Sequence, residues 1–401
     1  LNDREMRFAK SGQWWEQNVQ RALANNSVNY KEKPDVGTFM REWLSLYDSK
    51  SGERGIYNGM SARKTVEKLN ERYKDGDGNY IRRRDPKDDF GTNPCSEIIL
   101  RSREFCNLSE CVIRREDSRE SLKEKVRVAT ILGTFQSTLT EFKYLSREWK
   151  RNCDEERLLG VSLTGIMDNP ITNGSRNGLD KLLEELRDIA YETNKEWAEK
   201  LGIPPSAAIT CVKPSGTVSQ LVDSASGIHA RHNPFYIRTV RADNKDPLCN
   251  LMKEMGFPNE PDVTKPDHTT VFSFPMRSPK DAVFRMDMSA MEQLELWHTY
   301  AKSWCEHKPS VTISVKEDEW VDVAAWVYEH FDSISGISFL PFSEHVYRQA
   351  PYQDCTEEEY KEALKTMPKN VDWAQLSKYE SQDYTIASQE LACAAGGCEI
   401  I

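Results

Sequence analysis

A thiol flanked by an amide and a carboxylate stands out in the stretch Gly91-Thr92-Asn93-Pro94-Cys95-Ser96-Glu97-Ile98-Ile99-Leu100. Its first half is rich in turn residues and its last three residues are apolar, which predicts a loop that leads into a buried strand. Residues two apart in an extended chain point to the same side, so Asn93, Cys95 and Glu97 can converge on one small ligand. A carboxylate within hydrogen-bond reach of that ligand could act as a general base. A lone cysteine is more often a small buried apolar residue, so this interpretation depends on the rest of the chain.

Three further cysteines have spacings that suit thiol chemistry. Cys106 follows Cys95 by eleven residues. Cys393 and Cys398 lie at the end of the sequence with four small residues, Ala394-Ala395-Gly396-Gly397, between them. Small residues let two sulfur atoms approach each other, and a chain end can swing, so this pair is typical of a mobile dithiol. The alternative is two incidental cysteines on a frayed end, and the spacer of small residues weighs against it.

A possible phosphate-binding turn follows a predicted strand at 207–212. The sequence Pro214-Ser215-Gly216-Thr217-Val218 offers hydroxyl groups and backbone N–H groups at a predicted helix start, where an anion is favoured. An ordinary capped helix would have the same residues, and the two interpretations are about equally good from this stretch alone.

Composition limits the class of protein. The chain has 401 residues, 38% of them apolar and 29% charged, which suits a soluble globular protein of one large or two to three ordinary domains. We expect no membrane span and no leader, because no apolar run reaches the roughly 18–20 residues that a span needs. The net charge of −10 argues against nucleic-acid binding. Ten cysteines without a CxxC or HExxH motif favour reduced cytosolic thiols over a disulfide scaffold or a structural zinc site.

Hydrophobic periodicity predicts alternating strands and helices, and therefore an α/β fold with a largely parallel sheet or barrel. One face of the helix expected at 118–145 is assigned to packing: Leu122, Val126, Ala129, Leu132, Phe135, Leu139 and Phe142. Helices are expected at 1–24, 36–47, 61–74, 118–145, 179–201, 290–306, 318–330 and 356–366, and strands at 27–30, 56–58, 98–100, 207–212, 235–240, 269–274 and 310–316.

Taken together, these motifs resemble those of ribonucleotide reductases, and most closely the monomeric adenosylcobalamin-dependent (class II) ribonucleoside-triphosphate reductases. The matching stretches agree in order and spacing from about residue 12 to the end. They are 93–97, 105–109 (Phe-Cys-Asn-Leu-Ser), 157–161 (Arg-Leu-Leu-Gly-Val), 214–217 and 393–398.

The resemblance implies part of a ten-stranded α/β barrel, built of two five-stranded halves, with an internal finger loop. The chain would then divide into the remainder of the first barrel half (1–90), the finger loop (91–106), the second half (107–345), a C-terminal helical segment (346–390) and a flexible redox tail (391–401).

It also implies roles in deoxyribonucleotide synthesis for DNA replication. Cys95 would be the thiyl radical that takes the ribose 3′-hydrogen, Glu97 the base for the 3′-hydroxyl, and Asn93 a hydrogen-bond partner of the sugar. Cys106 would be one of two cysteines that supply reducing equivalents, and residues 214–218 would hold the substrate phosphates. Cys393 and Cys398 would re-reduce the active site and pass oxidation to a thioredoxin-like protein. Adenosylcobalamin is the implied cofactor, no residue can be named as a metal ligand, and the implied location is the cytoplasm, or the host cytoplasm if a phage encodes the chain.

One departure from the family pattern concerns the start of the chain. The family's partner for Cys106 and its allosteric nucleotide site lie upstream of the part that Leu1 begins. We therefore expect a C-terminal fragment, or a split enzyme whose N-terminal half is another chain. Alone, the chain is expected to lack about half the barrel and not to turn over.

Four alternatives compete with this interpretation. The catalytic subunit of a class I reductase is disfavoured because the sequence has no Tyr-Tyr pair, and a glycyl-radical enzyme because it has no Arg-Val-x-Gly-Tyr end. A non-catalytic half could merely scaffold a split reductase. A thiol–disulfide oxidoreductase that uses Cys393 and Cys398 is the weakest, since no thioredoxin-like CxxC unit is present.

Overall fold

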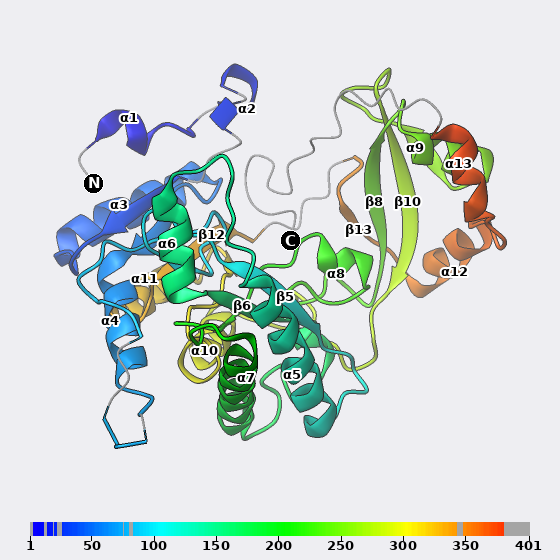
Figure 1. The fold of residues 1–401 in the computed structure, drawn as a ribbon. Helices are drawn as coiled ribbons and strands as arrows, with labels where there is room; N and C mark the ends of the chain where they lie inside the picture. Colours follow the sequence, from blue (N-terminus) through cyan, green and yellow to red (C-terminus); the bar gives the residue numbers. More distant parts are fainter. Residues whose placement is uncertain are drawn as a thin grey trace.

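The computed structural model describes residues 3–11, 14–18, 20–21, 26–74, 76–79, 83–342 and 348–380 (Figure 1). Its helices are α1 (Arg4–Arg7), α2 (Trp14–Gln17), α3 (Val36–Ser49), α4 (Gly59–Asn70), α5 (Arg119–Gln136), α6 (Arg147–Glu156), α7 (Leu179–Leu201), α8 (Val218–Leu221), α9 (Pro247–Glu254), α10 (Ala290–Ser303), α11 (Trp320–Glu329), α12 (Glu357–Thr366) and α13 (Leu376–Tyr379), with short 3₁₀ turns at Ile166–Asp168 and Trp373–Gln375. Its strands are β1 (Ser27–Tyr30), β2 (Gly55–Asn58), β3 (Gly91–Thr92), β4 (Ile99–Leu100), β5 (Asn107–Val112), β6 (Leu159–Thr164), β7 (Thr210–Cys211), β8 (Phe235–Asp243), β9 (Asn259–Pro261), β10 (Thr269–Arg277), β11 (Thr312–Val315), β12 (Gly336–Pro341) and β13 (Tyr352–Asp354).

Two sheets lie next to each other in the main body. Strands β5, β6 and β7 form a parallel sheet, and the second sheet has the order β1-β2-β12-β11. An isolated parallel bridge between Val212 and Pro309 joins the end of β7 to the residues that precede β11. Because β11 and β12 are parallel and β2 is antiparallel to β12, five strands run one way and the neighbouring pair β1–β2 runs the other way.

Strand β6 is the buried centre of the parallel sheet, and helices pack beside this sheet. All six residues of β6 are buried, as expected of a parallel strand covered on both faces. Helices α5, α7 and α10 gather along one side of the body (Figure 1), and α5 packs against α7. The buried indole of Trp304 donates to the Cys211 carbonyl at 2.7 Å, and that of Trp297 donates to the Pro309 carbonyl at 2.9 Å. These bonds tie α10 to both sheets.

A separate antiparallel sheet projects from the main body (Figure 1). Its order is β13-β8-β10-β9, and the long pair β8–β10 is in register from Phe235 opposite Arg277 to Asp243 opposite Thr269. Helices α9, α12 and α13 lie beside it (Figure 1). Strands β8 and β10 contain the strands expected at 235–240 and 269–274, but a largely parallel sheet was expected. This part of the expectation is corrected, because hydrophobic periodicity does not encode the direction of pairing.

Two predicted helices are wrong in their extent. In place of the helix expected at 1–24, the described residues form the one-turn helices α1 (Arg4–Arg7) and α2 (Trp14–Gln17). Between them the Ser11 hydroxyl and N–H both bond to the Phe8 carbonyl and offer a local alternative to helix. The helix expected at 118–145 ends at Gln136, because the hydroxyls of Ser137 and Thr138 bond back to the carbonyls of residues 134 and 135. The highly charged helix α6 was missed.

The assigned packing face of that second helix is only half correct. Leu122, Val126 and Ala129 are buried, but Leu132 and Leu139 are 57% and 75% exposed. Other elements agree closely: β1 and α7 have the predicted bounds. In the described ranges, no helix is both long enough and apolar enough to span a membrane.

Candidate functional site

The predicted loop at Cys95 is the tip of a short hairpin. Strands β3 and β4 pair antiparallel, with Thr92 opposite Ile99, and the six residues between them (93–98) form the tip of the finger loop expected at 91–106. The Ser96 N–H donates to the Asn93 carbonyl at 2.9 Å, and the Ile98 N–H donates to Asn93 Oδ1 at 3.0 Å. Asn93 therefore shapes the loop with its own side chain. Ser96 has a φ of 68°, a left-handed conformation that non-glycine residues seldom adopt.

Glu97 is a buried charged residue at the tip of the finger loop. It is 0% exposed, and Oε1 lies 3.2 Å from Lys213 Nζ. Its second oxygen, Oε2, is buried and has no hydrogen-bond partner of normal length among the described residues. Burial raises the pKa of Glu97, the positive charge of Lys213 opposes this, and a negative charge on Cys95 would raise it further. A buried carboxylate with one oxygen left over is suited to accept a proton.

The structure brings the loop's predicted residues together. Cys95 is half-buried, a negative charge on it would raise the pKa of Glu97, and a hydrogen bond from Asn93 lowers that pKa, so the three residues lie near one another. The eight cysteines in the described part of the chain are thiols, not disulfides. The burial of Glu97 shows that its carboxylate is not a solvated surface charge.

His307 holds the base of the finger loop. Its Nδ1 accepts from the Ile99 N–H at 3.2 Å, so Nε2 carries the proton and donates to the Leu159 carbonyl at 2.9 Å. Burial, together with the nearby positive charge of Arg84, lowers the pKa of His307 to about 3. The neutral ring therefore bridges β4 and β6 and fixes the hairpin against the sheet.

Cys106 directly precedes β5 and is half-buried. Its thiol donates to the Asn107 carbonyl at 3.2 Å. Burial raises its pKa well above the ordinary value, and the negative charges of Glu97 and Glu104 add to this. Cys106 is therefore a neutral thiol near Glu97. This is the form in which a thiol can give up a hydrogen atom.

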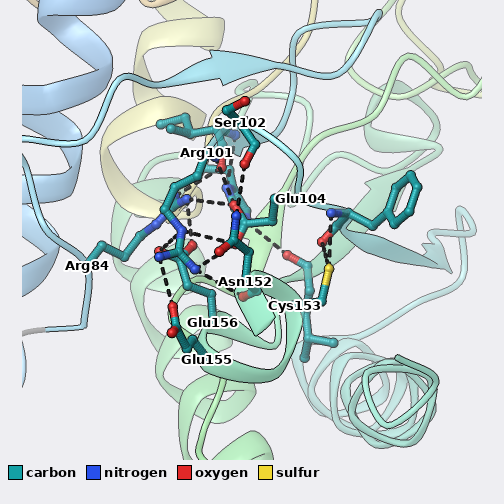
Figure 2. A network of polar contacts seen from close by, with 12 residues as sticks. Arg84, Arg101, Ser102, Glu104, Asn152, Cys153, Glu155 and Glu156 are labelled. Carbon is teal, nitrogen blue, oxygen red and sulfur yellow. Dashed lines mark hydrogen bonds and ion pairs between the residues drawn. The ribbon is translucent and has the colours of Figure 1, made fainter. Parts of the chain in front are cut away.

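A buried ionic network fixes the segment that carries Cys106 (Figure 2). Arg84 bonds to the Ile99 carbonyl at 3.0 Å and lies 2.8 Å from Glu156, while Arg101 reaches Glu156 at 3.0 Å. Glu104 accepts the Arg101 N–H at 2.8 Å, and burial next to Glu156 raises its pKa to about 8. Because its members come from the loop before Cys106, from the loop before β3 and from α6, this network links the finger loop to the helix layer.

The predicted phosphate turn is present and partly open. Pro214 and Ser215 are buried, whereas Gly216, Thr217 and Val218 are exposed. The following helix, α8, is only one turn long, so its dipole is small, and hydroxyl and backbone N–H groups would provide most of the anion contacts. Lys213 precedes this turn directly and contacts Glu97, so the phosphate turn and the finger loop are neighbours.

Sequence reasoning missed several residues around Glu97. Lys213 was next to a recognised motif but was given no role, and Lys308 and His307 lie in a polar run ahead of the predicted strand 310–316. Glu110, on β5, faces the same region. Burial raises its pKa, and a hydrogen bond from the Ser215 hydroxyl and the charge of Lys213 offset part of this rise. The signal that could have found the two lysines is a charged residue directly beside a buried strand. Cys393 and Cys398 lie outside the described residues.

Comparisons with known proteins point to one family. A protein of Euglena gracilis named adenosylcobalamin-dependent ribonucleoside-triphosphate reductase is 30% identical over 284 residues, which is 70% of this chain and 38% of that protein. One of the same name from Lactobacillus acidophilus is 27% identical over 340 residues, covering 77% of this chain and 45% of its own length. A probable reductase of this kind from Dictyostelium discoideum is 28% identical over 319 residues. No family model matches the chain.

The chain is related to the adenosylcobalamin-dependent ribonucleoside-triphosphate reductases. The resemblance noticed in its sequence is thereby confirmed. The chain spans somewhat less than half the length of these reductases, between 38% and 45% for the two relatives above.

The fold agrees with that of a class II reductase. The crystal structure of a B12-dependent (class II) ribonucleotide reductase superposes with a TM-score of 0.74 at 22% identity, over 96% of this chain and 55% of that one. The alpha subunit of the class Id reductase of Actinobacillus ureae gives a TM-score of 0.51 at 14% identity. The mixed α/β fold is therefore that of the class II reductase structure.

Proposed function

We propose that this chain is the C-terminal, catalytic portion of a ribonucleotide reductase that converts ribonucleoside triphosphates to 2′-deoxyribonucleotides by a thiyl-radical mechanism. The observation that carries the proposal is the buried carboxylate of Glu97, two residues from Cys95, with Oε2 available to a ligand. A solvated surface loop would not bury a charge in this way, because burial of a carboxylate costs free energy unless it is used or paired.

In this proposal Asn93, Cys95 and Glu97 each have one task. The Cys95 sulfur, as a thiyl radical, takes the hydrogen from ribose C3′ and later returns it. Glu97 accepts the proton of the 3′-hydroxyl, and Asn93 hydrogen-bonds the sugar. The 2′-hydroxyl leaves as water. Cys106 and a second thiol supply the two electrons and two protons and become a disulfide, and this second thiol would come from outside the chain.

Substrate phosphates would bind the turn from Pro214 to Val218. The exposed residues Gly216, Thr217 and Val218 leave room for an anion, and Lys213 adds a positive charge next to them. Because Lys213 also contacts Glu97, a nucleotide held at this turn has its ribose close to the finger loop.

Adenosylcobalamin, which the names of the relatives specify, supplies the radical when it is bound. Cys95 suits this use, since it is half-buried and so can be reached from one side. After each turnover, Cys393 and Cys398 would reduce the active-site disulfide and pass oxidation to a thioredoxin-like protein. We propose that the rest of the reductase is supplied by an N-terminal half, present as a separate chain or joined to this one, and that the enzyme acts in the cytoplasm.

We also propose that the main body is part of a ten-stranded α/β barrel. Its five parallel strands β5, β6, β7, β11 and β12 would form one five-stranded half, and β1 and β2, which run the opposite way, would belong to the remainder of the other. The corresponding division is 1–90 for the remainder of the first half, 91–106 for the finger loop, 107–345 for the second half, 346–390 for the C-terminal segment and 391–401 for the redox tail.

The proposal is tested by reconstitution. The chain is mixed with the N-terminal half of a related reductase, a ribonucleoside triphosphate, adenosylcobalamin and a dithiol, and deoxynucleotide is measured. We expect product from the wild-type chain and none from Glu97→Ala, with Glu317→Ala, an exposed carboxylate, as the matched control. Assembly with the N-terminal half but no product from the wild type would instead favour the non-catalytic scaffold.

A further inference from the structure

A buried lysine from a distant part of the chain reaches the tip of the finger loop. Lys308 is 2% exposed, and its Nζ lies 3.0 Å from the hydroxyl oxygen of Ser96. Ser96 stands between Cys95 and Glu97 and has the left-handed backbone conformation that turns the loop. The backbone N–H of Lys308 also donates to the Glu97 carbonyl at 3.2 Å. One residue thus holds the loop by both its side chain and its main chain.

The surroundings of Lys308 are shaped to fit this contact. Gly336, the first residue of β12, lies over it, and a Cβ added there would come within 2.4 Å of Ser96 Oγ and 2.5 Å of Lys308 Nζ. Tyr57, which pairs with Gly336 across β2 and β12, places its ring 5.1 Å from Nζ. An aromatic face attracts an ammonium group. The two strands β2 and β12 therefore enclose a single Lys–Ser contact.

Burial of an amine carries a desolvation cost. Burial lowers the pKa of Lys308 to about 7, and the negative charge of Glu97 offsets only part of that effect. An apolar residue of similar length would fill the same space without the desolvation of an ammonium group, and such replacements are often neutral or stabilising. A buried lysine that contacts the reactive loop is more simply explained by function than by packing.

We propose that Lys308 is a positioning residue: through Ser96 it holds the finger loop so that Cys95 and Glu97 face the substrate together. The inference deepens the proposed function of the same site and assumes that function for its effect on turnover. Lys308 also places a second amine near Glu97, from a different segment of the chain than Lys213. The buried carboxylate therefore does not depend on a single counter-charge. Lys308 itself does not touch the substrate in this proposal.

Hydrogen exchange of the 401-residue chain tests the contact without requiring activity. The variants are Lys308→Met, Ser96→Ala and the double variant, with Lys302→Met, an exposed lysine of the same region, as the control. The reporters are the N–H groups of Ser96 and Ile98, which are hydrogen-bonded within the loop. Both single variants should exchange about ten times faster at these amides, as should the double variant, because all three remove the same bond.

A purely structural lysine would behave differently. It would lower the urea midpoint of the whole chain in Lys308→Met, whereas a positioning lysine leaves that midpoint unchanged or higher. Additive effects of the two substitutions, or unchanged exchange of the loop amides in Lys308→Met, would overturn the proposal. If Lys308→Met does not fold, the lysine has a structural role and the proposal fails. Ser96→Ala keeps the lysine, and unchanged exchange of the Ile98 amide in that variant would also overturn the proposal.

Turnover in the reconstituted reductase gives a second readout. We expect kcat to fall at least tenfold in Lys308→Met and in Ser96→Ala, with KM for the nucleoside triphosphate within twofold of wild type, because the phosphate turn is intact. A rise in KM with unchanged kcat would contradict the assignment. If the wild type makes no deoxynucleotide, the proposed function fails, while the exchange experiment still decides whether Lys308 holds the loop.

Discussion

His307 gives the sharpest prediction about how the finger loop is held, because its ring works only when neutral. Nδ1 must accept the Ile99 N–H while Nε2 donates to the Leu159 carbonyl, and protonation of Nδ1 destroys the first bond. The folded pKa is lowered to about 3 by burial and by the charge of Arg84, whereas the unfolded chain keeps an ordinary value near 6.5. Between these values the unfolded chain binds a proton that the folded chain does not.

The sign and size of the effect follow from this difference. Stability from the neutral ring is complete above pH 6.5 and is lost as the pH falls toward 3. Between pH 6 and pH 4 the loss due to His307 alone amounts to about 2–3 kcal/mol of unfolding free energy. Glutamine at this position can still accept one bond and donate the other, but it does not titrate.

The assay is urea unfolding at pH 6 and pH 4 for the wild type, His307→Gln and the control His268→Gln, an exposed histidine. We expect His307→Gln to lose about 2–3 kcal/mol less than the wild type on acidification, while the control follows the wild type. All acidic groups are shared by the three proteins, so the difference isolates position 307. Equal losses in all three would refute the neutral bridge between β4 and β6.

Three further predictions concern the surroundings of the loop. Gly336→Ala should lower the unfolding free energy by about 1–3 kcal/mol in urea, because its Cβ would press on Ser96 and Lys308, while the control Gly91→Ala, whose Cβ meets nothing within 4 Å, should change little. Arg84→Met should lower the unfolding free energy by about 3–5 kcal/mol, because it leaves Glu104 and Glu156 buried with less positive charge. Arg119→Met, which breaks an exposed ion pair, should lower it by less than about 1 kcal/mol. Equal losses in the two variants would contradict this reasoning. Lys213→Met should move the acidic limb of the pH–rate profile of the reconstituted enzyme to higher pH, since Lys213 lowers the pKa of Glu97; an unmoved limb would mean that Glu97 is not the base.

Local pattern predicted much of the fold and most of the candidate site. The alternating apolar residues of β1 and the long amphipathic period of α7 determine these elements by themselves, so their bounds agreed. The finger loop was predictable because Asn93 both starts the turn and accepts its hydrogen bonds. The phosphate turn was recognisable from its proline, serine and glycine.

Non-local contacts account for what could not be predicted. The pairing of β8 with β10 depends on residues that are far apart in sequence, and nothing in either strand encodes its direction. Likewise, His307 meets Ile99 across 208 positions, and Lys308 meets Ser96 across 212. A buried lysine next to a proline has the sequence appearance of an ordinary surface charge. Only the folded chain distinguishes the two.

The central claim, that the sulfur at position 95 takes the hydrogen from ribose C3′, has one direct test. In the reconstituted reductase, deoxynucleotide formation is compared for a normal substrate and one deuterated at C3′, with wild type, Cys95→Ser and the control Cys355→Ser. We predict slower turnover of the deuterated substrate by the wild type and the control, and no product from Cys95→Ser. Normal deoxynucleotide formation by Cys95→Ser would contradict the account.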